Sequence, residues 1–261
     1  MRTNDLLQAW QNDQATLGLW MSSPDPVAAE QMGDLDFDYV CADLQHGILD
    51  YTDAVRLMMG LSRSAAMPIC RVPWNEPGII GKLLDAGAMG IIVPMVNTVE
   101  QAKAAVSACR FWPEGSRSHG PLRAKQIYGD DYVANANSQI ACIPMIETVE
   151  AISNLDDILD VPGINAVYIG PADLSLTYGL PPRPDNDDER FQSALQAVVE
   201  GCNKRGIAPG IHTTPELAQT RLDQGFKMVT ITSNLSAMAV GAGQALEKLR
   251  QPSGTSEASM Y

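Results

Sequence analysis

Eight short runs rich in apolar and β-branched residues alternate with segments of helical apolar spacing along the chain. Repeated strand–helix units predict a parallel sheet, because each helix carries the chain back to begin the next strand in the same direction. The predicted strands cover residues 17–20, 39–43, 68–72, 90–94, 142–147, 166–170, 208–212 and 228–232, and the predicted helices include residues 51–62, 77–85, 98–109, 189–205 and 215–225.

The number of units and the length of the chain favour closure of this sheet into a barrel. An α/β barrel typically needs ~250 residues, and this chain has 261, of which 45% are hydrophobic. An open doubly wound sheet is the alternative, but neither GxGxxG nor a phosphate-binding loop follows any predicted strand. The sequence therefore predicts a single-domain α/β fold, a (β/α)₈ TIM barrel over residues 1–250, with a mobile tail at 251–261.

Two segments interrupt the alternation of strands and helices. Residues 111–137 are rich in Gly, Arg and His, and they are predicted to form an active-site lid. Residues 180–188 contain Pro-Pro-Arg-Pro followed by acidic residues, which predicts an excursion on the surface.

The composition of the chain indicates which kinds of partner it can bind and in which compartment it works. A net charge of −13 and a pI near 4.5 would repel phosphate backbones, so nucleic-acid binding is not expected. Neither a signal-peptide pattern nor a membrane-length apolar run is found, so we expect a soluble cytoplasmic protein. The five cysteines form no CxxC pair and are expected to be reduced core residues.

Polar side chains stand at the ends of several predicted strands. Asp43 ends the second strand and His46 follows it, Arg71 lies near the end of the third, Glu147 ends the fifth, and Asp173 follows the sixth. Because catalytic groups of such barrels project from the carboxyl ends of the strands, these side chains are expected to meet at one mouth.

Glu147 and Asp173 are the candidate metal ligands. Two carboxylates suit Mg²⁺, Mn²⁺ or Co²⁺, with the remaining ligands supplied by water and substrate. The alternative is that each carboxylate caps the helix that follows it.

Asp43, His46 and Arg71 are the candidate catalytic residues. Asp43 is close enough in sequence to accept a ring N–H of His46 and leave the other ring nitrogen as a base, although a loop histidine can equally be solvated or structural. The Arg71 guanidinium suits an enolate or carboxylate oxygen, and its alternative is a salt bridge to Asp43 or Glu147. His119 and His212 rank lower, since neither has an acid at comparably short spacing.

Other features of the sequence bear on the substrate site. Backbone N–H groups at residues 170–173 are placed to bind a small carboxylate. Each lysine lies on a helical segment, in the expected lid or before the last strand, which disfavours a Schiff-base mechanism.

Five ordered blocks resemble the HpcH/HpaI aldolase family: DLQHG at 43–47, RVP at 71–73, LDAGAMG at 84–90, PMV at 94–96 and GPADL at 170–174. The resemblance covers nearly the whole barrel. It implies a class II, metal-dependent pyruvate aldolase of the 4-hydroxy-2-oxoheptanedioate or 2-keto-3-deoxy-sugar-acid type, in a family that commonly forms hexamers.

The resemblance also implies roles for individual residues. Glu147 and Asp173 would hold the metal, His46 with Asp43 would form the acid–base dyad, and Arg71 would steady the enolate. The amides of Ala172 and Asp173 would face the pyruvate carboxylate, Trp20 would line the substrate pocket, and Asp85 matches a further family position. Gln45, Ser118 and Met145 depart from residues common in the family, so the resemblance does not fix the hydrogen bonds that support the site residues or the preferred acceptor.

The sequence thus predicts an enzyme that cleaves 4-hydroxy-2-oxo acids reversibly to pyruvate and an aldehyde through a metal-bound pyruvate enolate. Alternatives are an oxaloacetate decarboxylase or malyl-thioester-type lyase on the same fold, and a non-catalytic barrel that binds a carboxylate. The expected partners are small molecules and further copies of the chain, as a trimer or hexamer. The motifs do not name the aldehyde.

Overall fold

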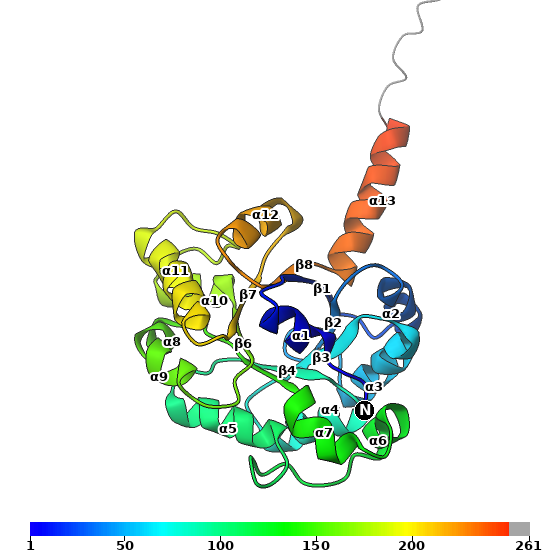
Figure 1. Ribbon diagram of the computed structural model, residues 1–261. Coiled ribbons are helices and arrows are strands. Elements are labelled where there is room, and N and C mark those ends of the chain that lie inside the picture. Colours follow the sequence, from blue (N-terminus) through cyan, green and yellow to red (C-terminus); the bar gives the residue numbers. More distant parts are fainter. Residues whose placement is uncertain (251–261) are drawn as a thin grey trace, which may run out of the picture.

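A computed structural model describes residues 1–250 and shows eight parallel strands surrounded by helices (Figure 1). Strands with consecutive numbers pair side by side except β5 and β6, and β1 pairs with β8. The strands are β1 (Thr16–Met21), β2 (Tyr39–Asp43), β3 (Met67–Arg71), β4 (Gly90–Val93), β5 (Ala141–Pro144), β6 (Ala166–Ile169), β7 (Ala208–His212) and β8 (Met228–Ser233).

The remaining gap, between β5 and β6, is bridged just beyond the end of β5. Met145 forms an isolated parallel bridge with Tyr168, and the Ile146 N–H donates to the Tyr168 carbonyl at 2.9 Å. The eight strands therefore form a nearly closed barrel, and the (β/α)₈ prediction is confirmed.

The helices lie mostly on the outside of the barrel. They are α1 (Asp5–Gln11), α2 (Pro26–Gly33), α3 (Tyr51–Gly60), a 3₁₀ turn at Leu61–Arg63, α4 (Pro77–Ala86), α5 (Val99–Cys109), α6 (Leu122–Tyr128), α7 (Tyr132–Gln139), α8 (Val149–Ser153), α9 (Leu155–Leu159), α10 (Pro171–Thr177), α11 (Glu189–Asn203), α12 (Pro215–Asp223) and α13 (Asn234–Arg250).

Local chemistry explains where several helices begin and end. Capping boxes start α3 at Asp50 and α5 at Thr98, where each side chain accepts an N–H from the first turn. Gly87 ends α4 with a φ of 110°, a left-handed conformation that glycine adopts without steric cost.

The barrel interior combines apolar packing with one buried polar cluster. The Thr230 hydroxyl lies 2.9 Å from the Tyr39 hydroxyl, and the Tyr168 hydroxyl donates to it at 2.6 Å. Gly18 makes room for this cluster, because a Cβ there would lie 2.0 Å from the Tyr39 ring. All five cysteines are buried and free, as the sequence predicts.

Residues 111–137 do not form a lid over the carboxyl ends of the strands, so that prediction is wrong. Arg117 pairs with Asp85 at 2.7 Å near the end of α4, and the Tyr128 hydroxyl donates to the Gly87 carbonyl. Gly87 leads into β4, so the segment lies on the amino-terminal side of the barrel, where α6 packs against α4. His119 and the family departure Ser118 belong to this segment, away from the predicted mouth.

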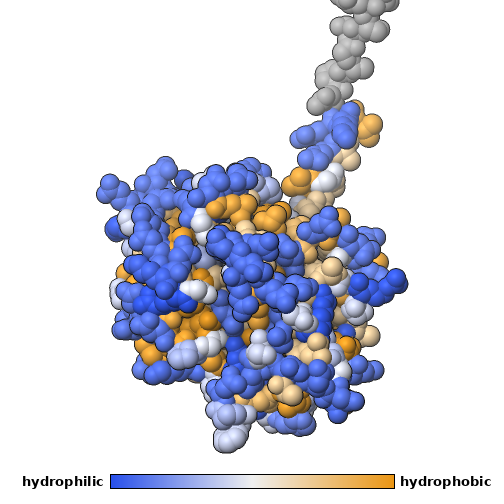
Figure 2. Space-filling model, in the orientation of Figure 1, coloured by the Kyte–Doolittle hydropathy of each residue, from blue (hydrophilic) through white to orange (hydrophobic). Residues whose placement is uncertain are grey.

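Helix α13 projects away from the barrel instead of packing along it (Figure 1). Its exposed apolar side chains include Leu235, Met238, Val240 and Leu246, and Figure 2 shows apolar colour where the helix leaves the body. The predicted mobile tail at 251–261 lies outside the described residues, and the domain boundary at 250 stays a prediction. Within residues 1–250, no helix has the length and apolar character needed to cross a membrane.

Candidate active site

A cavity of about 270 Å³ opens at the carboxyl ends of the strands and brings the predicted site residues together. Its lining includes Trp20, Asp43, His46, Arg71, Glu147, Ala172 and Asp173. It also includes Gly170 and Pro171 of the predicted carboxylate-binding turn, the lower-ranked His212 and the family departure Met145. Three lining residues were not singled out by the sequence: Ser22, Tyr168 and Ser233.

Asp43 and Arg71 form a buried, two-pronged ion pair across neighbouring strands. Arg71 Nε donates to Asp43 Oδ1 and Arg71 Nη2 donates to Asp43 Oδ2, both at 2.8 Å. Burial by itself would raise the pKa of Asp43, but the Arg71 hydrogen bonds and charge outweigh it and hold the pKa below its usual value. Of the two salt bridges considered for Arg71, the structure contains the one to Asp43.

Trp20 packs against the guanidinium of Arg71. The guanidinium carbon lies 4.3 Å from the centroid of the Trp20 ring, a cation–π contact. Because Nε and Nη2 are bound to Asp43, Nη1 is the edge of the guanidinium left for a ligand. The indole Nε1 of Trp20 is buried without a hydrogen-bond partner in the described chain. Both groups are donors, which suits an anionic or carbonyl ligand.

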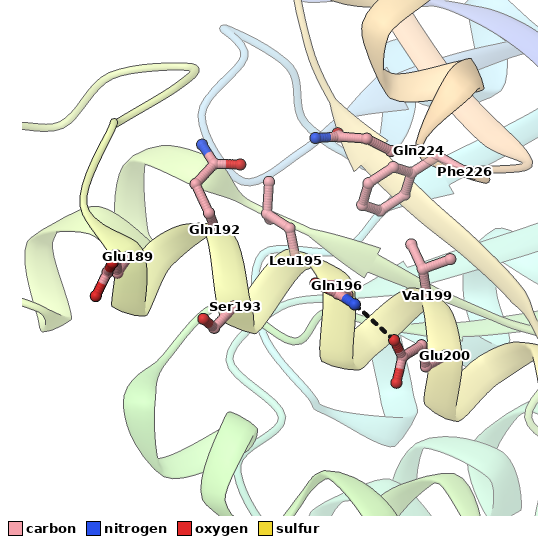
Figure 3. Close-up of a pocket in the computed structure, with 9 residues that line it drawn as sticks. All are labelled: Glu189, Gln192, Ser193, Leu195, Gln196, Val199, Glu200, Gln224 and Phe226. Carbon is pink, nitrogen blue, oxygen red and sulfur yellow. Dashed lines mark hydrogen bonds between the residues drawn. The ribbon is translucent and has the colours of Figure 1, made fainter.

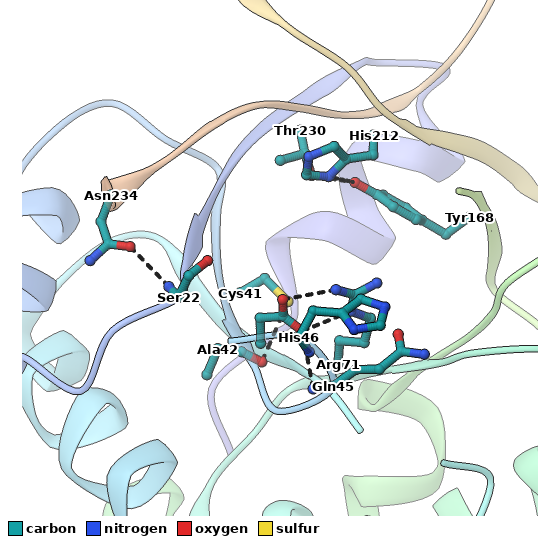
Figure 4. A network of polar contacts seen from close by, with 11 residues as sticks. Ser22, Cys41, Ala42, Gln45, His46, Arg71, Tyr168, His212, Thr230 and Asn234 are labelled. Atoms are coloured by element: carbon teal, nitrogen blue, oxygen red, sulfur yellow. Dashed lines mark hydrogen bonds and ion pairs between the residues drawn. The ribbon is translucent and has the colours of Figure 1, made fainter. Parts of the chain in front are cut away.

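His46 lies at the cavity rim with an exposed side chain, and its ring is not bonded to Asp43. Asp43 Oδ1 instead accepts the backbone N–H groups of Gln45, at 3.2 Å, and His46, at 3.3 Å. The predicted dyad geometry is therefore corrected: Arg71 occupies the carboxylate, and the turn after β2 is fixed through its backbone (Figure 4). The buried Gln45 Oε1 has no partner among the described residues.

Glu147 is almost fully buried, three residues beyond the end of β5. Its Oε1 accepts the N–H of Met95 at 2.8 Å, and Met95 has a φ of 56°, unusual for a residue other than glycine. A Cβ on residue 170 would lie 2.2 Å from Glu147 Oε2, so Gly170 is needed to leave room for the carboxylate.

The electrostatics of Glu147 and Asp173 fit a bound cation. Burial, with a contribution from the Asp173 charge, raises the pKa of Glu147 to about 7. Two acids thus share a cavity in which ionisation of the buried one is disfavoured, and a divalent cation would relieve this. Residues 1–250 contain no cluster of three or more His, Cys, Asp or Glu side chains arranged for a metal, so water and substrate would complete the coordination.

Neither acid makes the side-chain cap hydrogen bond of the helix-cap alternative, although Asp173 does lie in the first turn of α10. Thr148, not Glu147, caps α8 and accepts the Ala151 N–H. Gly170 is the N-cap of α10, where no side-chain cap bond is made. The N–H groups of Ala172 and Asp173 in the first turn of α10 have no partner within residues 1–250 and remain available to a ligand.

His212, at the end of β7, is the most informative residue that the sequence ranked low. Its Nδ1 lies 3.3 Å from the Tyr168 hydroxyl (Figure 4). Its ring meets the Trp20 ring edge-on, with 4.9 Å between the ring centroids. Because Tyr168 donates its proton to Thr230, its oxygen accepts from His212 and selects the Nδ1–H tautomer. Burial is the main factor that lowers the pKa of His212 to about 4, so the ring is neutral near pH 7. Its position at the carboxyl end of a strand was the sequence feature that could have placed it in the site.

Two further cavities lie near or outside this site. One of about 730 Å³ adjoins it and is lined in part by residues 182–184, 213–216 and the start of α13. Another, of about 580 Å³, lies on the outside of the barrel between α11 and the segment before β8 (Figure 3). Its lining, which includes Gln192, Gln196, Glu200 and Phe226, shares no residue with the site at the strand ends.

Comparisons with known proteins find relatives that match nearly the whole chain. The hydroxypyruvate/pyruvate aldolase of Rhizorhabdus wittichii is 37% identical over 248 residues, 95% of this chain and 99% of that protein. The 2-dehydro-3,6-dideoxy-6-sulfogluconate aldolase of Pseudomonas putida is 34% identical over 239 residues, 90% of this chain and 93% of that protein.

A solved structure described as an HpcH/HpaI aldolase/citrate lyase family protein from Burkholderia cenocepacia J2315 matches with a TM-score of 0.89. It is 28% identical and covers 95% of this chain and 100% of its own. The model of the HpcH/HpaI aldolase/citrate lyase family matches residues 16–239, which contain the eight strands and every predicted site residue. The chain therefore belongs to the HpcH/HpaI aldolase/citrate lyase family.

Proposed function

We propose that this chain is a divalent-metal-dependent aldolase that reversibly cleaves 4-hydroxy-2-oxo acids to pyruvate and an aldehyde through the pyruvate enolate. The observation that carries the proposal is the meeting of Glu147, Asp173 and Arg71 in one cavity at the strand ends. Relatives named as hydroxypyruvate/pyruvate and 4-hydroxy-2-oxo-heptane-1,7-dioate aldolases, 37% and 34% identical to this chain, support the same reaction class.

Glu147 and Asp173 are the proposed metal ligands, and Mg²⁺, Mn²⁺ and Co²⁺ are the candidate ions. When bound, the ion would polarise the keto and carboxylate oxygens of pyruvate and so acidify its methyl protons. Support comes from the shared cavity and from the raised pKa of Glu147.

The other residues would position the substrate and move its proton. The Nη1 edge of Arg71 would hold the oxygen on which negative charge develops, in the orientation set by Asp43 and Trp20. The Ala172 and Asp173 amides would receive the pyruvate carboxylate. His46, with its ring free of Asp43 and exposed at the rim, would take the methyl proton and return it during cleavage.

The test is pyruvate release from a panel of 4-hydroxy-2-oxo acids, measured with metal-free protein and after addition of each candidate ion. A parallel experiment follows deuterium uptake into the pyruvate methyl group. We expect both activities to need metal, and Glu147→Gln to lose both while Glu150→Gln, at an exposed position on α8, retains them. Pyruvate binding without exchange or cleavage would identify a non-catalytic carboxylate-binding barrel, and preferred turnover of oxaloacetate would identify a decarboxylase.

We also propose that the chain forms a trimer or hexamer and works in the cytoplasm. The projecting helix α13, with its exposed apolar side chains, supports association with further copies. The five free, buried cysteines are compatible with a reducing compartment. Sedimentation velocity of the full chain tests the assembly, and a monomer at micromolar concentration would contradict it.

A further inference from the structure

The 730 Å³ cavity adjoins the proposed reaction site. The two cavities share Pro171, Ala172, His212 and Ser233, so they meet along one wall. If pyruvate occupies the smaller cavity, the larger one is the adjoining space into which the remainder of a longer substrate can extend. Its chemistry therefore bears on which aldehyde the enzyme accepts.

Two hydrogen-bond donors line this second cavity and have no protein partner within residues 1–250. Arg183 is exposed and makes neither an ion pair nor a hydrogen bond there. Thr213 is 3% exposed, and its Oγ1 is buried without a partner. A guanidinium donates only, and an unpaired buried hydroxyl costs free energy unless a ligand binds it. Both features suit a ligand with acceptor oxygens.

The loop that carries Arg183 is anchored from behind. Arg221, which is fully buried, donates through Nη2 to the Pro184 carbonyl at 3.1 Å and to Asp185 Oδ1 at 2.8 Å. Gln192 Nε2 donates to the same Asp185 oxygen at 2.8 Å. Prolines on both sides of Arg183 further restrict its backbone. The surface segment predicted at residues 180–188 thus forms an anchored wall of the cavity.

Glu216 provides the opposing charge in the same cavity. It is exposed, and a hydrogen bond from the Thr214 side chain lowers its pKa, so it is ionised near pH 7. No salt bridge within 4 Å joins it to Arg183 in the described chain, so the guanidinium is not neutralised by a direct contact. The negative charge of Glu216 would weaken the binding of an anion. Removing that charge should therefore strengthen anion binding, the opposite of the effect expected from removing Arg183.

We propose that the second cavity binds the far end of the acceptor aldehyde and that Arg183 selects acceptors that end in an oxyanion such as a carboxylate or phosphate. The proposal rests on the proposed function and adds the substrate class to it. Thr213 would supply a second donor, and His212 would form the boundary between the reacting carbon and the acceptor chain.

The test compares kcat/KM for 4-hydroxy-2-oxo acids of matched chain length that end in a carboxylate, a phosphate or a methyl group. We expect the wild type to prefer an anionic end over methyl. Arg183→Gln should lower that preference on the order of 10-fold, the size of one charge-assisted hydrogen bond at a partly solvated site. Glu216→Gln should raise it. Arg190→Gln is the matched control, because Arg190 pairs with Asp188 outside both cavities.

The outcomes separate this proposal from the proposed function. Deuterium exchange into pyruvate by the wild type needs no acceptor and reports on the enolate chemistry alone. If exchange occurs but Arg183→Gln keeps the wild-type preference, or the wild type does not favour anionic ends, the acceptor assignment is overturned. The carboxylate and phosphate arms show which oxyanion the cavity prefers.

Discussion

Protonation of Glu147 should control metal affinity near neutral pH. A carboxylate must lose its proton to bind a metal, and burial places the pKa of this one at about 7. With that pKa, the ionised fraction is about nine-tenths at pH 8 and about one-tenth at pH 6. The apparent Kd for Mn²⁺ should therefore be about 10-fold weaker at pH 6, whereas a solvent-exposed glutamate would be ionised at both pH values and give almost no change.

Titration calorimetry of the metal-free protein measures this linkage directly. At pH 7, binding should release about half a proton per metal ion, which is obtained by comparing buffers of different ionisation enthalpy. Glu150→Gln should keep the pH dependence and Glu147→Gln should lose it together with most of the affinity. His46→Ala is a second control, because histidines titrate in the same pH range. An equal Kd for the wild type at pH 6 and pH 8 would refute the assignment of Glu147.

The raised pKa of Glu147 should also make the stability of the metal-free protein depend on pH. The folded state binds the Glu147 proton more tightly than the unfolded state does, so this contribution to stability is lost as pH rises through about 7. The metal-free protein should lose about 1 kcal/mol of unfolding free energy from this group between pH 6 and pH 8. Urea denaturation at the two pH values checks it, and a loss of the same size in Glu147→Gln would assign the effect to another group.

Three further predictions concern the residues around Arg71. Asp43→Asn should destabilise the fold by ~3–5 kcal/mol in urea denaturation, because it leaves a buried guanidinium unpaired; a cost below 1 kcal/mol would show that the pair is dispensable. Arg71→Lys should fold but lose most turnover, because an ammonium cannot reproduce the two-pronged pairing with Asp43, and wild-type turnover would make Arg71 structural. His46→Ala should still bind metal and pyruvate, while methyl exchange and cleavage fall together by ~10²–10⁴-fold; wild-type exchange would make His212 the next base to test.

The alternation of buried runs and helical segments was enough to predict the barrel. Strands covered on both faces need continuous apolar runs, and helices between them enforce parallel order. The same pattern predicted which polar residues reach one mouth, because the carboxyl ends of parallel strands share one edge. Asp43, Arg71, Glu147 and Asp173 were found this way, and all four line the cavity.

Only the tertiary structure decided how those side chains pair. His46 is three residues from Asp43, but the register of β2 and β3 sets Arg71 beside Asp43, where its planar fork occupies both carboxylate oxygens. Sequence spacing alone could not show that Asp43 would pair with Arg71 on the neighbouring strand instead of with the imidazole of His46. The role of Gly170 in making room for Glu147, and the contact of Tyr168 with His212, depend likewise on distances across the barrel.

The segment at 111–137 shows the limit of reading composition without topology. Gly, Arg and His resemble the content of an active-site lid, but this segment joins helix α5 to strand β5. In a barrel of parallel strands, connections from a helix to the next strand lie at the amino-terminal end, opposite the mouth. The order of elements contained that information, while the contacts of Arg117 and Tyr128 that fix the segment there exist only in the folded chain.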